Sequence, residues 1–253
     1  MEPKERPVVV ETDILVLGGG AAGVSAAIGA KEQNPRLRVT IAEKAGNIER
    51  SGDTAAGVDH NLGIMEEGEY WDTPEGVLKN FPEITDDMTP IVTARTFCYE
   101  NRERILAMER LGMPYQKDPE TGKYVRSPGF GLTGSHFIHL EGYDWKRILA
   151  KEARRMGTAV YQRVMTTNLL LDGRKVIGAM GFHIRTGQFF VFLAKQTILT
   201  AGDAVRYGTA PSGTPFDTWQ CPANTGDGHA MAFRAGATLA NMEFTPTTLI
   251  PGF

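Results

Sequence analysis

The stretch ILVLGGGAAGVSAAIGA, residues 14–30, runs from apolar residues through three consecutive glycines into a series of small residues. A second apolar run, RVTIA at residues 38–42, follows after an interval long enough for a helix. A strand, a glycine turn, a helix and a second strand form a βαβ unit, and such units build parallel sheets. The sequence therefore predicts an α/β fold.

The glycines Gly18, Gly20 and Gly23 fit the spacing GxGxxG between this strand and helix. We expect Gly18 to permit the tight turn, Gly20 to let a pyrophosphate approach the backbone, and Gly23 to let the helix pack against the strand. The pyrophosphate would then lie at the helix N-terminus, beside Ala21 and Ala22, where free N–H groups attract anions.

An acidic residue, Glu43, ends the second apolar run, 20 residues beyond Gly23. A carboxylate at this place can accept hydrogen bonds from both hydroxyls of an adenosine ribose. Glycines, helix, strand and acidic residue in this order predict a dinucleotide-binding site. The alternative is a glycine-rich turn that binds nothing.

The composition narrows the class of protein. A net charge of −3 over 253 residues, with scattered basic residues, argues against nucleic acid or anionic lipid as partner. We expect a cytoplasmic protein without a membrane span, since no signal-peptide core and no apolar run of about 18 residues occur. Cys98 and Cys221 lie far apart, so we expect no disulfide framework and no metal site, and an iron–sulfur cluster would belong to another chain.

Further along the chain the pattern is less regular. Residues 47–88 lack periodicity and are expected to form a long functional loop. A helix is predicted after Thr89, its expected N-cap, as far as Gly112, and a second helix over residues 143–157. Five apolar runs between residues 158 and 200 predict a β-meander that returns to the sheet.

Two segments, ERSGDTAAGVD at 49–59 and NTGDGHAMAFRAGATLANMEF at 224–244, resemble the fumarate reductase and succinate dehydrogenase flavoprotein family, including the alpha subunit of adenylylsulfate reductase. The resemblance implies a glutathione-reductase-type FAD-binding domain, Rossmann-like, with a parallel sheet and a β-meander. The glycine pattern alone does not separate FAD from NAD. The two segments favour FAD, with a NAD-dependent dehydrogenase as the alternative.

The resemblance also implies contacts to the cofactor. Glu43 and Lys44 would meet the adenosine ribose, and Val164 would contact adenine through its backbone. The residues expected along the pyrophosphate, ribityl chain and flavin ring are Arg50, Ser51, Gly52, Thr54, Ala55, Ala56, Gly57, Ala201, Gly202 and Asp227. For Ser51 a structural role is the alternative, and Asp227 could instead cap the helix that follows it.

Two positions at which the sequence differs from the family bear on the attachment of FAD and on the substrate. Succinate dehydrogenases carry a histidine bonded covalently to the flavin where this chain has Gly52, so we expect FAD to be non-covalent. Thr248 lies near the place of a histidine that holds a substrate carboxylate, which argues against succinate and fumarate. The catalytic residues stay unknown, with His60, His136 and His139 as the histidines that could face a substrate.

The function predicted from these features is an FAD-dependent oxidoreductase subunit. It would exchange two electrons with a small polar substrate and pass them to an iron–sulfur partner. The alternative is a flavin-binding, assembly or electron-transfer module without a substrate site of its own. The family continues beyond this point into a capping domain, so residues 1–253 are expected to be one FAD-binding domain, the N-terminal part of such a protein.

Overall fold

The computed structural model describes residues 6–55, 58–129, 131–142, 145–204, 221 and 223–242. The chain divides into a larger unit, Met1–Gly57 with Leu149–Phe253, and a smaller unit, Val58–Ile148.

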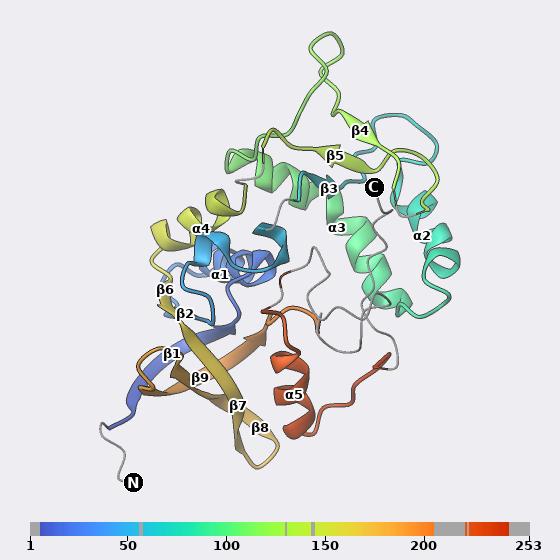
Figure 1. The fold of residues 1–253 in the computed structure, drawn as a ribbon. Helices are drawn as coiled ribbons and strands as arrows, with labels where there is room; N and C mark the ends of the chain where they lie inside the picture. Colours follow the sequence, from blue (N-terminus) through green and yellow to red (C-terminus); the bar gives the residue numbers. More distant parts are fainter. Residues whose placement is uncertain are drawn as a thin grey trace, which may run out of the picture. The chain divides into compact units, whose positions relative to one another are not determined.

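A six-stranded sheet forms the larger unit (Figure 1). The strands, in their order across the sheet, are β6 (Ala159–Gln162), β2 (Val39–Glu43), β1 (Val8–Leu17), β9 (Phe189–Leu199), β8 (Lys175–His183) and β7 (Val164–Asp172). The first four run parallel, and β8 is antiparallel to both of its neighbours, β9 and β7. The predicted α/β class, with a parallel sheet that continues into antiparallel strands, is confirmed.

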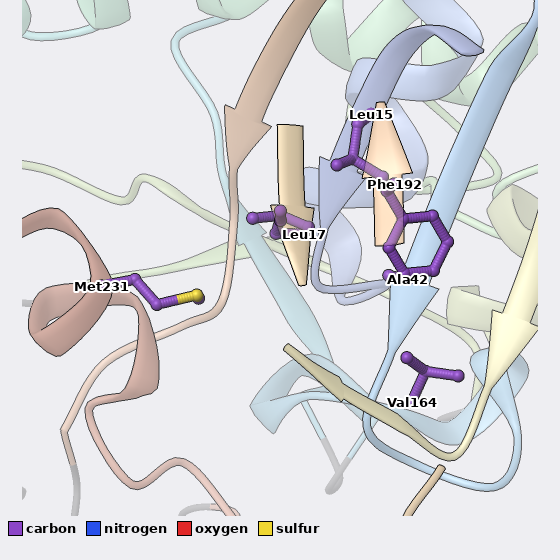
Figure 2. Packing of buried hydrophobic residues seen from close by; sticks show 7 residues of the cluster. Leu15, Leu17, Ala42, Val164, Phe192 and Met231 are labelled. Atoms are coloured by element: carbon purple, nitrogen blue, oxygen red, sulfur yellow. The ribbon is translucent and has the colours of Figure 1, made fainter. Parts of the chain in front are cut away.

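The predicted βαβ unit consists of β1, helix α1 (Ala21–Gln33) and β2. Both strands are buried where they pair, because the parallel strands carry apolar side chains towards both faces. Figure 2 shows the core on one side of this sheet, where Leu15, Leu17 and Phe192 pack. Met231 brings helix α5 (Asp227–Arg234) into the same cluster.

The predicted five-strand meander is wrong in two respects. The first run is β6, which pairs with β2 at the opposite edge of the sheet. The last two runs form the single strand β9, although Lys195 interrupts its apolar pattern. Its side chain is exposed and its ammonium lies 2.8 Å from Asp13 Oδ1, so a polar residue there does not end the strand.

The smaller unit contains an antiparallel sheet of three short strands and two helices. The strands are β3 (His60–Leu62), β5 (Phe137–His139) and β4 (Arg126–Ser127), and the helices are α2 (Pro74–Ile84) and α3 (Ile91–Arg110). The boundary between the units falls within helix α4 (Trp145–Arg155). Two short 3₁₀ helices, η1 (Ile48–Arg50) and η2 (Asp53–Ala55), belong to the larger unit.

Residues 47–88 were expected to form a loop, and the structure corrects this with η1, η2, β3 and α2. The start of α2 has ordinary sequence signals, because Thr73 caps the Gly76 N–H at 3.0 Å and Pro74 takes the first helical position. Val77 and Phe81 then pack beside Cys98. Thr89 is not the N-cap of α3, which begins after Pro90 without a side-chain cap.

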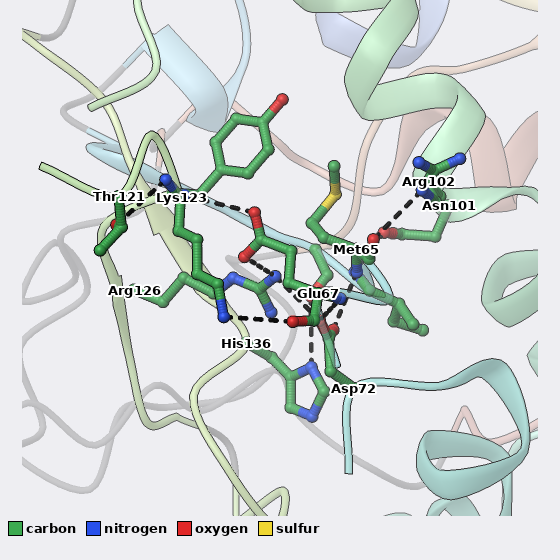
Figure 3. A network of polar contacts seen from close by, with 12 residues as sticks. Met65, Glu67, Asp72, Asn101, Arg102, Thr121, Lys123, Arg126 and His136 are labelled. Atoms are coloured by element: carbon green, nitrogen blue, oxygen red, sulfur yellow. Dashed lines mark hydrogen bonds and ion pairs between the residues drawn. The ribbon is translucent and has the colours of Figure 1, made fainter. Parts of the chain in front are cut away.

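A buried ionic network ties the segment before α2 to strand β4 (Figure 3). Arg126 Nη2 lies 2.6 Å from Glu67 Oε2 and 2.9 Å from Asp72 Oδ2. Backbone N–H groups of Met65 and Glu67 also donate to Asp72, at 2.8 and 2.9 Å. Burial alone would raise the pKa of Asp72, but Arg126 and these N–H groups together lower it.

Candidate functional site

A cavity of about 360 Å³ lies in the larger unit, where β1, β2 and β9 end. The carboxyl ends of parallel strands meet at one edge of a sheet, which is where α/β proteins bind their ligands. The residues expected at the cofactor that line the cavity are Gly18, Gly20, Ala21, Ala22, Glu43, Lys44, Arg50, Ser51, Gly52, Thr54, Val164, Ala201, Gly202 and Asp227. Gly23 and Ala55 do not line it, and Ala56 and Gly57 lie outside the described residues.

The three glycines of the motif have different surroundings. Gly18 has φ +106°, and a Cβ added there would lie 2.4 Å from the Thr200 carbonyl oxygen. A Cβ at Gly23 would lie 1.9 Å from the Gly18 oxygen. A Cβ at Gly20 would meet no atom within 4 Å, although Gly20 lines the cavity. The fold itself therefore requires glycine at Gly18 and Gly23, whereas Gly20 leaves a space that a ligand can fill.

Two features at the same edge can attract an anion, although Glu43, Asp53 and Asp227 also line the cavity. Helix α1 begins with neither a side-chain cap nor an acidic residue in its first turn, so its N-terminal dipole is uncompensated. Arg50 is exposed and lines the cavity, and its guanidinium makes no hydrogen bond or ion pair with any residue that the structure describes. A helix N-terminus and an available guanidinium beside an open glycine suit a phosphate-bearing ligand.

Glu43 is buried at the end of β2 and already holds the glycine turn. Its Oε2 accepts the N–H of Gly19 and its Oε1 accepts the N–H of Ala45, both at 2.5 Å. Each carboxylate oxygen keeps a second acceptor site, so Glu43 can also accept a ribose hydroxyl. Its side chain therefore has a structural task in addition to the predicted binding task.

Ser51 is 2% exposed, and its hydroxyl lies 2.9 Å from the Gly19 oxygen and 3.2 Å from the Ile48 oxygen. A hydroxyl has one proton to donate, and two carbonyl acceptors compete for it here. These contacts fasten the loop after η1 to the glycine turn. They favour the structural alternative for the Ser51 side chain.

Lys44 and Asp227, expected at the ribose and the flavin, contact each other through Lys44 Nζ and Asp227 Oδ2. Lys44 Nζ also donates to the Ala223 oxygen at 2.6 Å and to Thr225 Oγ1 at 3.1 Å. Asp227 is the first residue of α5 and does not cap it with its side chain, because the N-cap is Gly226. The pair holds residues 223–227 against the end of β2.

Sequence reasoning missed Asp53, Asn224 and Asp203. Asp53 accepts the backbone N–H of Cys221, and its Oδ2 accepts Asn224 Nδ2 at 2.7 Å. Asn224 Nδ2 lies 3.3 Å from Asp203 Oδ1. Burial chiefly raises the pKa of Asp53, and the neighbouring Asp203 adds to the rise. The only sequence signal for Asp53 is its place within the segment that resembles flavoproteins.

The candidate histidines belong to the smaller unit, whereas the described residues that line the cavity belong to the larger unit. His136 is 1% exposed, with its ring nitrogens near the carbonyl oxygens of Gly63 and Thr133. His60 Nδ1 lies 2.7 Å from Asp59 Oδ1, and His139 Nε2 lies 2.8 Å from Ser127 Oγ. No substrate role follows from these contacts.

The described residues contain no group of three or more His, Cys, Asp or Glu side chains that could hold a metal ion. Both cysteines are free, and burial raises the pKa of the Cys98 thiol to about 11. None of the helices in the described part of the chain is long and apolar enough to cross a bilayer.

In this sheet a glycine turn follows β1, an acidic residue ends β2, and the cavity at their carboxyl ends is bordered by the start of α1 and by Arg50. This arrangement is that of a dinucleotide-binding protein. A family model described as an FAD binding domain matches residues 13–251. The chain therefore belongs to this family, as the FAD-binding domain of the fumarate reductase and succinate dehydrogenase flavoproteins.

Relatives of known name agree with this assignment. The chain is 30% identical to the fumarate reductase flavoprotein subunit of Mycobacterium tuberculosis, over 92% of this chain and 38% of that protein. It is 25% identical to the 8-methylmenaquinol:fumarate reductase flavoprotein subunit of Wolinella succinogenes, over 95% and 38%. The solved adenylylsulfate reductase of Archaeoglobus fulgidus superposes with a TM-score of 0.76 at 30% identity, over 93% and 39%. The chain thus spans about two fifths of each relative's length.

Proposed function

We propose that this chain binds FAD non-covalently in the cavity at the carboxyl ends of β1, β2 and β9, and that residues 1–253 act as one FAD-binding domain. The observation that carries the proposal is the juxtaposition of Gly20, the uncapped N-terminus of α1 and the guanidinium of Arg50 around one cavity. A pyrophosphate needs close backbone approach, free N–H donors and a cation, and this edge of the sheet offers all three.

Different residues of the chain would bind different parts of the cofactor. Glu43 would accept hydrogen bonds from the adenosine ribose, while the backbone at Val164 borders the adenine. Arg50 and the first turn of α1 would bind the pyrophosphate, and Gly52, Thr54 and the turn Ala201–Gly202 would lie along the flavin half. Gly52 has no side chain to bond the flavin, which supports a non-covalent cofactor.

We assign the domain to an oxidoreductase subunit that exchanges two electrons with a small polar substrate. Bound FAD supplies the redox chemistry, because it accepts electrons in pairs and releases them singly. Relatives such as the fumarate reductase flavoprotein subunit of Mycobacterium tuberculosis are by name subunits of a larger enzyme, so the electron partner that we propose is a separate iron–sulfur protein. Thr248, which bears on the choice of substrate, lies outside the described residues.

Release of the cofactor tests the binding proposal. The purified chain is precipitated by acid or heat, and the supernatant and the pellet are analysed for flavin and nicotinamide nucleotides. We expect FAD in the supernatant. Flavin retained by the pellet would contradict non-covalent binding, and a nicotinamide nucleotide alone would contradict FAD as the cofactor.

The partner is tested separately on the complex isolated from its native source. Iron and acid-labile sulfide are measured per flavin, and the proteins that copurify are identified. We expect an iron–sulfur protein in the complex. A complex that contains flavin but no iron would contradict this partner and favour a flavin-binding module without that electron route.

A further inference from the structure

A single residue, Arg163, joins strand β6 to strand β7. The two strands lie at opposite edges of the six-stranded sheet, so the chain changes direction at this corner. Arg163 has φ +58°, a left-handed conformation that is unfavourable for residues with a Cβ. The contacts around Arg163 must therefore hold it in place. The next residue, Val164, lines the cavity in which we propose that FAD binds.

Hydrogen bonds at this corner hold the loop after β2, residues 44–48. The N–H of Arg163 donates to the Ala45 oxygen at 3.0 Å. The side-chain oxygen of the preceding residue, Gln162, accepts the N–H of Ile48 at 3.0 Å. Ala45 also lines the cavity, so the loop forms part of the cavity wall. The corner thus fixes this part of the wall at two points.

The guanidinium of Arg163 lies flat against Gly46, in the middle of the same loop. A Cβ added to Gly46 would lie 2.7 Å from Nη1 of Arg163 and 2.8 Å from both Cζ and Nη2. Because three atoms of the planar group are at nearly the same distance, its face rather than its edge is turned towards Gly46. The guanidinium makes no hydrogen bond or ion pair with any residue in the described part of the chain. Its contribution to holding the loop is therefore packing.

We propose that Arg163, through its packing on Gly46, is a positioning residue for the adenosine half of the dinucleotide. This inference rests on the proposed function. The loop that Arg163 holds also orients the carboxylate of Glu43, since Glu43 Oε1 accepts the N–H of Ala45 at 2.5 Å. Groups that are already fixed in the free protein bind a ligand more tightly, because less freedom is lost on binding. Without the guanidinium the loop moves more freely, and Glu43 loses its fixed orientation towards the ribose hydroxyls.

A double-mutant cycle tests the contact between Arg163 and Gly46. Arg163→Ala removes the guanidinium and keeps the Cβ, whereas Gly46→Ala displaces the guanidinium with an added methyl group. In isothermal titration calorimetry we expect either variant to bind FAD about ten-fold more weakly, and the double variant to show no further loss, because the methyl group then meets no guanidinium. Losses that multiply in the double variant would overturn the contact.

The matched controls are Arg174→Ala, an exposed arginine in the turn between β7 and β8, and Gly29→Ala, where an added Cβ meets nothing within 4 Å. Neither residue lines the cavity, so both variants should bind FAD as the wild type does. A ten-fold loss in the controls as well would overturn the assignment to Arg163.

Two comparisons separate packing from charge and the adenosine half from the flavin half. Arg163→Lys keeps the positive charge but has no planar group to lie on Gly46, so we expect it to bind FAD as weakly as Arg163→Ala. ADP carries the adenosine and both phosphates without the flavin, and its affinity should fall by the same factor as that of FAD. Wild-type affinity in Arg163→Lys would overturn the packing contact, and an unchanged affinity for ADP would overturn the assignment to the adenosine half.

A readout without ligand separates this inference from the proposed function. Hydrogen–deuterium exchange of the apo chain, followed by mass spectrometry, reports on the hydrogen-bonded amides of Ala45 and Ile48. Exchange in a peptide covering residues 44–50 should be at least ten-fold faster in Arg163→Ala than in the wild type, while a peptide from α1 serves as the internal reference. If the wild type bound no FAD, the proposed function would fail, and an unchanged exchange rate would overturn the role of Arg163 by itself.

Discussion

At the scale of single residues, the glycines of the GxGxxG motif have different roles. Gly18 and Gly23 face backbone oxygens that an added Cβ would strike, so substitution there disturbs the turn itself. Gly20 borders open space in the cavity. We expect Gly20→Val to abolish FAD binding while leaving the fold intact, because its methyl groups would occupy the position of the pyrophosphate.

The matched control is Gly29→Val in helix α1, for which Gly20 is the N-cap. An added Cβ at Gly29 also meets nothing within 4 Å, but Gly29 does not line the cavity. Equilibrium titration with FAD and circular dichroism are measured on both variants. Equal affinity of the two variants would remove Gly20 from the binding site.

Glu43 combines a structural task with a predicted binding task, and a conservative change affects both. Glu43→Gln keeps one oxygen for a backbone N–H but turns an NH₂ group towards the other. We expect FAD affinity to fall by about 1.5 to 3 kcal/mol, the usual loss for hydrogen bonds to a charged group. Isothermal titration calorimetry checks this against Glu32→Gln, an exposed position of α1. Unchanged affinity would limit Glu43 to holding the glycine turn.

At the scale of elements, the link between Arg126 and Asp72 joins β4 to the segment before α2. The pKa of Asp72 is lower in the folded chain than its ordinary value of 3.8, so its contribution to stability is complete above that value. It is lost as the pH falls through the folded pKa. We therefore expect the smaller unit to lose stability as the pH falls below 3.8 and through the lower pKa of folded Asp72.

The variant Asp72→Asn isolates this contribution. In this variant Glu67 is the remaining charged partner of the buried Arg126 guanidinium among the described residues. We expect the free energy of unfolding at pH 7 to fall by about 3 kcal/mol. Urea unfolding at pH 7 and pH 3.5 is followed by tryptophan fluorescence, to which Trp71 and Trp145 of the smaller unit contribute, and the variant should show a smaller acid sensitivity. Glu103→Gln, at an exposed pair with Arg110, is the control. Equal acid sensitivity of Asp72→Asn and the wild type would assign the effect to other carboxylates.

Helix α3 carries Cys98 into the core of the smaller unit, beside Val77. With a pKa of about 11, its thiol is almost entirely protonated at pH 8, and the thiolate is the reactive form. We expect Ellman's reagent to modify Cys98 at pH 8 only after denaturant unfolds this unit. Rapid modification of Cys98 in the native chain would contradict the packing of α3 against α2.

At the scale of the whole molecule, ligand binding and stability are coupled. FAD at 100 times its dissociation constant should stabilise the chain by about 2.7 kcal/mol, if the unfolded chain does not bind it. For a chain of this size that corresponds to a rise in melting temperature of about 5 to 10 °C. Differential scanning calorimetry with and without FAD measures the rise, and NAD serves as the matched control. An equal rise with NAD would contradict selectivity for FAD.

The sequence by itself determined the βαβ unit, the edge of the sheet at which the cavity lies, and the family. These features follow from local patterns, because glycine spacing and apolar runs act on neighbouring residues of the chain. Only the tertiary structure placed β6 beside β2 and brought Asp53 to Asn224 and Lys44 to Asp227. Those partners are separated by 171 and 183 residues, and no local pattern encodes which polar side chains meet when distant segments pack around a common cavity.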